Sequence, residues 1–443
     1  MNISEMENFK SLILKDEEIS QDIFFDLSCL YQLILKLWQG PVYTEFKNDI
    51  AAMPLIIAQF SEIPDNLIIH SSFVELFVSF LKIEDKQIQK DSLIVLDQII
   101  YLSDAALMIL MNHSLNPDTN FIGNLFSLLS RFKENELYII ILGILLAIVK
   151  KEKSLQIRQP IPIVPSLIGL FAENGMKNRE VIENYLLILK IFSKENQSET
   201  LIPFLDDILR TSFKFITNPK LCSISFSILC NLTTKGFFQQ ILDCSILEYC
   251  TKLLKDLRFH ESIRKIAKFF TCLIEIDANF IEIIPLQEFH QVLMHQKVNF
   301  KQKLNILILF EKIALMGGLC YILQGIGSSI LFCLLDESEF CLREKIYHLL
   351  WAGLFSLNTP DEQISVMNSN IFVSMTHFTD FQDDDIPKIF PFLKHILDSS
   401  YESKLSDQVR ETIKEFALDW IQSDNEIMAD AATEFLDTYN DTI

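Results

Sequence analysis

Glycine and proline are scarce in this sequence, and their scarcity excludes several classes of protein. The 443 residues include 11 glycines and 13 prolines, whereas average usage is about 7% glycine and 5% proline. A β-sandwich with many tight turns, a glycine-rich nucleotide-binding fold and a disordered linker each need more of these residues. Because 49% of the residues are hydrophobic, the composition predicts a helix-rich protein that is folded along its length.

Basic residues are outnumbered by acidic ones. The 38 lysines and arginines against 59 aspartates and glutamates give a formal net charge of -21. Such a field repels the phosphates of nucleic acids and anionic lipids, so we expect neither nucleic acid nor a membrane as a partner. It would attract basic peptides, although acidity also serves solubility alone. One acidic cluster is predicted to be a solvated loop and comprises Asp380, Asp383, Asp384 and Asp385.

Motifs for catalysis, metal binding or cofactor binding are missing. His290 and His295 are five residues apart and do not share one helix face as the histidines of HExxH do. We expect them to be ordinary surface or capping histidines. The pair Gly325-x-Gly327 lacks the third glycine and the preceding strand of a dinucleotide-binding loop. We therefore expect no enzyme activity, no metal and no cofactor.

Cysteine usage bears on the compartment. The nine cysteines form no CxxC pair, and most lie in apolar runs, which is typical of buried, reduced thiols. The first residues, MNISEMENFK, are polar and acidic where a signal peptide is basic and then apolar. We therefore expect an intracellular protein. The cysteines are Cys29, Cys222, Cys230, Cys244, Cys250, Cys272, Cys320, Cys333 and Cys341.

Two long apolar runs raise the question of a membrane span. The run Leu137 to Val149 is shorter than the about 20 residues that cross a bilayer and is predicted to be a buried helix. The run Ile313 to Leu335 is long enough, but it contains Gly317-Gly318, Gly325 and Gly327. These breakers predict two helices joined by a turn, with a membrane-associated protein as the alternative.

A repeat is visible in the sequence. A short apolar helix pattern that ends in paired aliphatic residues recurs about every 42 residues, as in armadillo and HEAT repeats. It ends at Leu81, Leu129, Phe171, Leu209, Leu254, Met294, Leu335 and Met375. Longer runs such as Lys86 to Ile100 and Ser262 to Ile276 place apolar residues at i, i+3, i+4 and i+7 and are predicted to be helices.

The repeat predicts the fold class and its domain boundaries. Each unit has too much apolar surface to bury alone, so units stack into a continuous core with a concave face. We expect an all-α, right-handed solenoid of about nine or ten armadillo-like or HEAT-like repeats over residues 27–443. Residues 1–26 form an acidic N-terminal segment with seven acids and two lysines, and residues 423–443 form a polar capping helix.

Several segments resemble the armadillo domain of importin α, the adaptor that carries proteins with basic localisation signals into the nucleus. They are Ile63 to Ile99, Ser225 to Leu254, Glu362 to Phe372 and the closing DNEIMADAATEFLDTYN. The resemblance implies a cytoplasmic and nuclear transport adaptor that binds an extended basic peptide. In that family a Trp-x-x-x-Asn pair on the third helix of each repeat holds the peptide, since positions i and i+4 share one face. The indole rings take lysine or arginine stems, and the asparagine amides bind the peptide backbone.

The family pattern can be carried over to seven helix positions, of which few match. The pairs are Ile94/Gln98, Leu142/Leu146, Leu186/Lys190, Ser227/Asn231, Lys268/Cys272, Ile308/Lys312 and Trp351/Phe355. For the last pair Tyr347/Trp351, one helical turn earlier, also fits. We predict peptide-binding roles for Gln98, Ser227, Asn231 and Trp351. Alternatives remain open, because Asn231 can be satisfied locally and Trp351 can be a packed core residue.

Two departures from the family favour a second hypothesis. Lysines at clamp positions, namely Lys190, Lys268 and Lys312, would repel a basic peptide. The acidic residues 1–26 also lack the basic segment that recruits importin β, so we expect no importin β recruitment of the usual kind. The alternative is an armadillo scaffold for protein–protein interaction that has no transport role.

Overall fold

The computed structural model describes most of the chain beyond residue 70. The described residues are 71–114, 121–132, 135–152, 163–173, 178–337, 339–376, 388–398, 402–422 and 426–439. Over these ranges the chain forms α-helices, short 3-10 helices and one π-helical turn, without a strand. The acidic segment 1–26, the thiol of Cys29 and the acidic cluster at 380–385 lie outside these ranges.

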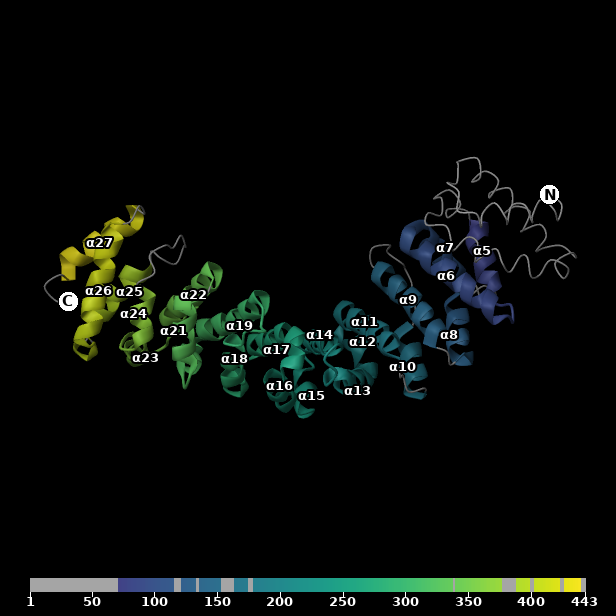
Figure 1. Cartoon of the computed structure of the whole chain (residues 1–443), viewed down its shortest axis with the longest axis horizontal. Helices are drawn as coiled ribbons and strands as arrows, with labels where there is room; N and C mark the ends of the chain where they lie inside the picture. Colours follow the sequence, from purple (N-terminus) through teal and green to yellow (C-terminus); the bar gives the residue numbers. More distant parts are fainter. Residues whose placement is uncertain are drawn as a thin grey trace, which may run out of the picture. The chain divides into compact units, whose positions relative to one another are not determined.

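The chain divides into two compact units, Met1–Asn196 and Gln197–Ile443. Within the first unit α6, α9 and α11 pack side by side in chain order (Figure 1). The shorter helices come between them in the sequence. The helices of this unit are α5 Ser71–Phe80, α6 Lys86–Leu102, α7 Asp104–Ser114, α8 Phe121–Arg131, α9 Asn135–Glu152, α10 Ile163–Glu173 and α11 Arg179–Glu195.

In the second unit α14, α17, α19 and α22 follow one another and pack in the same way (Figure 1). The α-helices of this unit are α12 Ser198–Leu201, α13 Leu205–Ile216, α14 Cys222–Thr233, α15 Phe238–Asp243, α16 Ile246–Lys255, α17 Ile263–Ile276, α18 Leu286–Leu293, α19 Phe300–Ile313, α20 Leu319–Leu323, α21 Gly327–Glu337, α22 Phe340–Ser356, α23 Pro360–Met367, α24 Asn370–Thr376, α25 Ile389–Leu397, α26 Asp407–Ile421 and α27 Glu426–Tyr439. The other turns are η2 Ile202–Phe204, η3 Leu257–Ser262, η4 Ala278–Ile283, η5 Ala314–Gly318 and η7 Glu402–Lys404.

The seven packed helices α6, α9, α11, α14, α17, α19 and α22 are called the third helices below, and they confirm the predicted repeat. Successive third helices begin about 37 to 49 residues apart, within or close to the armadillo and HEAT range. The helix predictions for Lys86 to Ile100, Leu137 to Val149 and Ser262 to Ile276 are confirmed by α6, α9 and α17. The predicted all-α solenoid of armadillo-like repeats is therefore confirmed.

Polar residues at the starts of third helices explain where these helices begin. The Asp85 carboxylate accepts hydrogen bonds from the backbone N–H groups of Gln87 and Ile88 at 2.9 and 3.1 Å. Asn299 and Gln302 form a capping box at the start of α19. Such caps satisfy N–H groups that have no partner within the helix.

Buried amides then fasten each of these helix starts to the preceding segment. The Gln89 side chain donates to the carbonyl oxygens of Leu81 and Ile83 at 3.0 and 2.7 Å. The Gln302 side chain donates to the His260 carbonyl oxygen at 2.8 Å. Buried glutamines in the first turns of these helices therefore connect them to the preceding segments of the chain.

The apolar run Ile313 to Leu335 folds as predicted, into two helices with a turn between them. The backbone leaves helical geometry at Met316 and at Gly317, where φ is +81°. It turns again before α21, with Gly325 at φ +61°. By length and composition the stretch Phe300–Leu323 is the one candidate for a membrane span among the described residues, and half of its most apolar window is buried in the protein.

Candidate functional site

The third helices share one side that is less buried than the others, which we call the third-helix face. On six of the seven helices the exposed and half-buried residues recur along this side at intervals of three and four, whereas on α14 the central residue is buried. The central residues of these faces are Ile94, Gly143, Leu187, Ser227, Lys268, Ile308 and His348. All of them except Ser227 are half-buried or exposed, so the face is accessible to a ligand along each unit.

Asn231 and Ser227 lie together on the face of α14, one helical turn apart. Asn231 is half-buried, and its side chain is one turn from the C-terminal end of the helix. Ser227 is only 6% exposed, and its hydroxyl donates to the Ser223 carbonyl oxygen at 2.8 Å. Asn231 is therefore the more accessible of the two, whereas Ser227 contributes mainly a small side chain beside it.

Gln98 lies on the face of α6, in the first unit, close to a half-buried carboxyl group. Ile94, Asp97 and Gln98 are all half-buried there. A Cβ atom added to Gly143 of α9 would lie 3.7 Å from the Asp97 carboxylate, so α9 approaches α6 closely at this point. Burial raises the pKa of the Asp97 carboxyl group because desolvation disfavours its charged form.

Trp351 is not on the third-helix face, and its prediction as a peptide-contacting residue is wrong. Its side chain is 2% exposed and packs against the rings of Phe372 and Phe416, with ring centroids 6.1 and 6.0 Å away. The positions of α22 around Trp351 that are only half-buried are instead His348 and Ala352, which are four residues apart. The large apolar indole is buried in the core, where it removes the most apolar surface from water.

The sequence alignment is also shifted by one residue on α9 and α11. Leu142 and Leu186 are fully buried, and Gly143 and Leu187 occupy the centres of these faces. All of these helices are apolar on several sides, so periodicity alone did not distinguish the buried stripe from the exposed one.

The observed positions of the third-helix faces identify two amides that were not predicted from the sequence. Asn184 on α11 and Asn305 on α19 are half-buried, each one turn before the centre of its face. The Asn305 side-chain nitrogen donates to the Lys301 carbonyl oxygen at 2.5 Å, which leaves its oxygen as an acceptor for other donors. In the sequence, each is a polar residue one turn before an apolar one. This pattern identifies a face position only once it is known which side of the helix is exposed.

Ion pairs join neighbouring third helices along this face. Lys312 of α19 lies 3.2 Å from Glu275 of α17, and Lys345 of α22 pairs with Glu311 of α19. In the first unit, Lys90 of α6 lies 2.5 Å from Glu136 of α9. The lysine at the predicted clamp position 312 is therefore neutralised by a glutamate on the preceding third helix, which weakens its repulsion of a cationic ligand.

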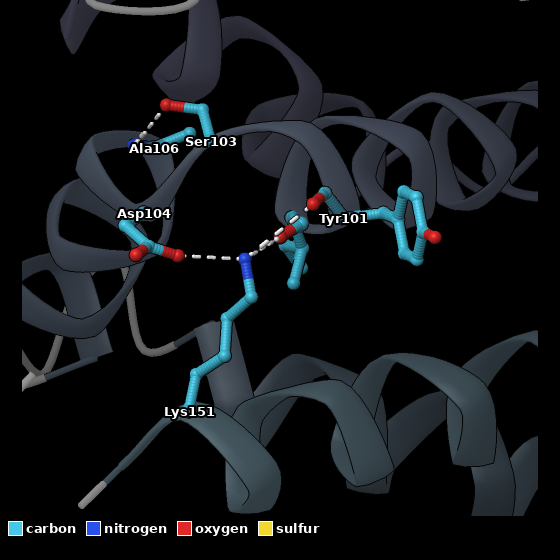
Figure 2. Close-up of polar contacts among 6 residues, drawn as sticks. Tyr101, Ser103, Asp104, Ala106 and Lys151 are labelled. Atoms are coloured by element: carbon cyan, nitrogen blue, oxygen red, sulfur yellow. Dashed lines mark hydrogen bonds and ion pairs between the residues drawn. The ribbon is translucent and has the colours of Figure 1, made fainter. Parts of the chain in front are cut away.

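A different contact holds the end of α6 (Figure 2). The Lys151 ammonium group donates to the Ile100 carbonyl oxygen at 2.9 Å and pairs with Asp104 at 2.7 Å. The Ser103 hydroxyl accepts from the Ala106 N–H at 3.3 Å, so it caps the start of α7. The cation thus binds carbonyl groups at a helix C-terminus, where the helix dipole favours positive charge.

His290 is a core residue, which corrects the expectation of a surface or capping histidine. It is 1% exposed, and burial lowers its pKa to about 4. A Cβ atom on Gly327 would lie 1.9 Å from the Ile322 carbonyl oxygen and 2.8 Å from the His290 ring. Gly327 therefore allows a close approach between helices. His295 does act in a cap, since its Nδ1 atom accepts from the Lys297 N–H at 3.1 Å.

Comparisons with known proteins support the fold and name no family. No protein-family model matches the sequence. No curated protein matches it either. The structure is similar to that of an engineered protein, with a TM-score of 0.62 and 16% sequence identity, over 93% of this chain and 98% of that one. This likeness shows a shared fold alone.

Designed armadillo repeat proteins give shorter matches. One matches with a TM-score of 0.42 and 15% identity, over 54% of this chain and 99% of its own. Another, whose structure contains a (KR)4 peptide, matches with a TM-score of 0.37 and 14% identity, over 63% of this chain and 99% of its own.

Proposed function

We propose that this protein is a non-catalytic, intracellular scaffold that binds an extended segment of a partner protein along the third-helix face of one of its units. The observation that supports the proposal is that the central residue of the face is half-buried or exposed on six of the seven third helices, the exception being Ser227 of α14. A row of equivalent positions suits a ligand that is itself periodic, such as an extended peptide.

Amide groups on this face support a peptide as the ligand. Gln98, Asn184, Asn231 and Asn305 each place a carboxamide on a third helix, half-buried beside apolar or small residues. A carboxamide can donate to a peptide carbonyl and accept from a peptide N–H at once. Each such bond contributes about 1 kcal/mol, so a few of them support micromolar binding together with apolar contacts.

A transport adaptor similar to importin α is a second candidate, and the first unit favours it. There, the half-buried Asp97 carboxyl lies next to the Gln98 amide, and a lysine or arginine of the ligand would stabilise its charged form. The second unit lacks this feature. Its face has Lys268 and Lys312 at clamp positions and no exposed indole among the described residues. If the protein is a transport adaptor, we therefore expect its first unit to bind the basic peptide.

An unbiased selection tests the proposed scaffold function. A library of random peptides of about 12 residues would be panned on the purified chain, and enriched peptides would be measured for binding to variants. We expect binding to weaken in Asn231→Ala and Ile308→Glu, both on the third-helix face. It should be unchanged in Lys252→Gln, an exposed residue of α16. Enriched peptides that ignore both face variants would contradict the proposal.

A further inference from the structure

The starts of α17 and α19 bring like charges together. The two helices are packed against each other, and Glu275 and Lys312, near their C-terminal ends, lie 3.2 Å apart. Arg264 and Lys301 lie eleven residues earlier on their respective helices, which is about three helical turns. In the register set by this contact, Arg264 and Lys301 occupy equivalent positions on neighbouring third helices.

Lys268 and Asn305 occupy the next turn in the same register. Lys268 is exposed and Asn305 is half-buried. Arg264, Lys268, Lys301 and Asn305 together are called the basic cluster. In the part of the chain that the structure describes, no carboxylate lies within 4.0 Å of the charged groups of Arg264, Lys268 or Lys301. Lys312 and Lys345 on the same face are both paired with glutamates.

This arrangement is costly unless an anion joins it. Neighbouring like charges repel one another, and a chain with 59 acidic residues had many available to neutralise these three. The N-terminal ends of α17 and α19 add positive partial charge from their unpaired N–H groups. The cluster therefore concentrates positive charge locally in a protein whose net charge is -21.

We propose that the basic cluster binds one or two carboxylate side chains of an acidic segment in a partner protein, and that apolar residues of the same segment follow along α19 and α22. The inference rests on the proposed scaffold function and specifies its ligand. Past the cluster, the same face carries Ile308, 41% exposed, and Leu315, 51% exposed, and then the half-buried Phe355 of α22. These side chains offer the apolar surface that such a segment would cover.

The dimensions fit a short extended segment. Packed helices lie about 8–10 Å apart, so a ligand crossing α17, α19 and α22 spans two spacings, about 20 Å. The last apolar contact, Phe355, also lies about 14 residues further along the shared register than Lys301, which is about 21 Å at 1.5 Å per residue. The diagonal is therefore about 29 Å, and an extended chain that advances about 3.3 Å per residue covers it in about nine residues. A segment with acids at one end and two or three apolar residues at the other matches this length.

A nucleic acid would satisfy the cluster less well than a few carboxylates. Duplex DNA carries one charge per about 1.7 Å, and the cluster is followed on the same face by the ion pair of Glu275 and Lys312 and by apolar residues. A polyanion would meet these groups and the net negative field of the protein.

Fluorescence polarisation with defined peptides tests the inference on the full chain. The probe is a fluorescein-labelled peptide of about 12 residues with aspartates and glutamates followed by leucine and phenylalanine. Its matched control has asparagine and glutamine in place of the acids. The variant is the triple substitution Arg264→Gln, Lys268→Gln, Lys301→Gln, and the control variant is Lys214→Gln, Lys252→Gln, Lys394→Gln on α13, α16 and α25.

We expect the acidic peptide to bind the wild type and to lose at least about tenfold in affinity in the cluster variant, because three exposed charge contacts are each worth up to about fivefold. The control variant should bind as the wild type does, and the amide peptide should bind more weakly. An equal loss in both triple variants would overturn the inference by showing diffuse attraction only. Tighter binding of a labelled oligonucleotide, lost in the cluster variant, would also overturn it.

The outcome separates this inference from the proposed function. If random-library peptides bind the third-helix face but carry no acids, and the acidic peptide does not bind, the scaffold stands and the ligand assignment is wrong. If no library peptide depends on the third-helix face, the proposed function is wrong, whatever the acidic peptide does.

Discussion

The third helices of the two units carry comparable exposed faces but use their basic residues differently. In the first unit Lys90 is paired with Glu136, and Lys151 is held by Asp104 and by the last carbonyl groups of α6. In the second unit Lys312 and Lys345 are paired, whereas Arg264, Lys268 and Lys301 have no carboxylate within 4.0 Å among the described residues. Third-helix lysines are thus tied into the fold in both units, but three basic residues of the second unit have no such carboxylate partner.

This difference shows why residue type alone does not identify a binding position in a repeat protein. A lysine on a third helix stabilises the fold when the neighbouring repeat supplies a carboxylate or a helix end. It remains a ligand-binding candidate when the neighbour supplies another cation. The deciding information is the register between helices.

The largest expected effect tests the register of the second unit. Trp351→Ala should lower the free energy of unfolding by about 3–5 kcal/mol, because it removes a fully buried indole. His348→Ala, three residues earlier on the exposed face, should change it by less than about 0.5 kcal/mol. Chemical denaturation of the two variants measures both values. A small loss in Trp351→Ala with a large one in His348→Ala would reverse the assignment of the two sides of α22.

Acid should destabilise the second unit through His290. Its pKa of about 4 in the folded protein compares with about 6.5 in the unfolded chain. Between these values the unfolded chain binds a proton that the folded protein does not. Stability is therefore complete above pH 6.5 and falls as the pH drops toward 4, by up to about 3 kcal/mol.

In the first unit, Asp97 should make stability change with pH in the opposite direction. Burial raises the pKa of Asp97 in the folded state, so its protonation on acidification favours folding until the unfolded carboxyl also titrates.

The His290→Leu variant tests the contribution of this histidine. It should remove the part of the acid-induced loss of stability between pH 6.5 and 4 that comes from His290, measured by thermal denaturation of the full chain. If the loss is unchanged in this variant, His290 is not its source.

Paired and unpaired lysines should differ in their effect on stability. Lys151→Met should cost about 1–2 kcal/mol, because it leaves carbonyl groups of α6 and the Asp104 carboxylate without their charged partner. Lys268→Met should be neutral or slightly stabilising, since it removes repulsion from Arg264 and Lys301. Urea denaturation distinguishes the two. Equal losses of unfolding free energy in the two variants would show that the paired and unpaired lysines do not differ in their contribution to stability.

Much of the fold was predictable, since the repeat is a property of apolar spacing. The boundaries of α6 and α17 and the turn inside Ile313 to Leu335 follow from periodicity and from glycine. The position of Trp351 did not follow, because every side of α22 is apolar enough to be buried and the resemblance to importin α suggested an exposed tryptophan. The basic cluster was also missed, because Arg264 and Lys301 are 37 residues apart and become neighbours only through helix packing.

The smallest expected effect concerns the amide on α14. Asn231→Ala should weaken a third-helix ligand by about tenfold, the about 1.4 kcal/mol expected for one lost hydrogen bond that leaves a partner unsatisfied. Gln240→Ala, which truncates an exposed amide on α15, serves as the matched control. Binding measured by fluorescence polarisation that falls equally in both variants would show that the loss does not depend on the amide of the third-helix face.

The central claim is that the third-helix face is the binding surface, and a matched pair of isoleucines tests it most directly. Ile308 lies at the centre of this face on α19 and is 41% exposed, while Ile202 lies on η2 and is 61% exposed. The dissociation constant of a library-selected peptide would be measured for Ile308→Glu and Ile202→Glu. We expect a loss of at least about tenfold for Ile308→Glu, from burying a charge under the ligand, and no change for Ile202→Glu. Unchanged binding in Ile308→Glu together with a loss in Ile202→Glu would contradict it.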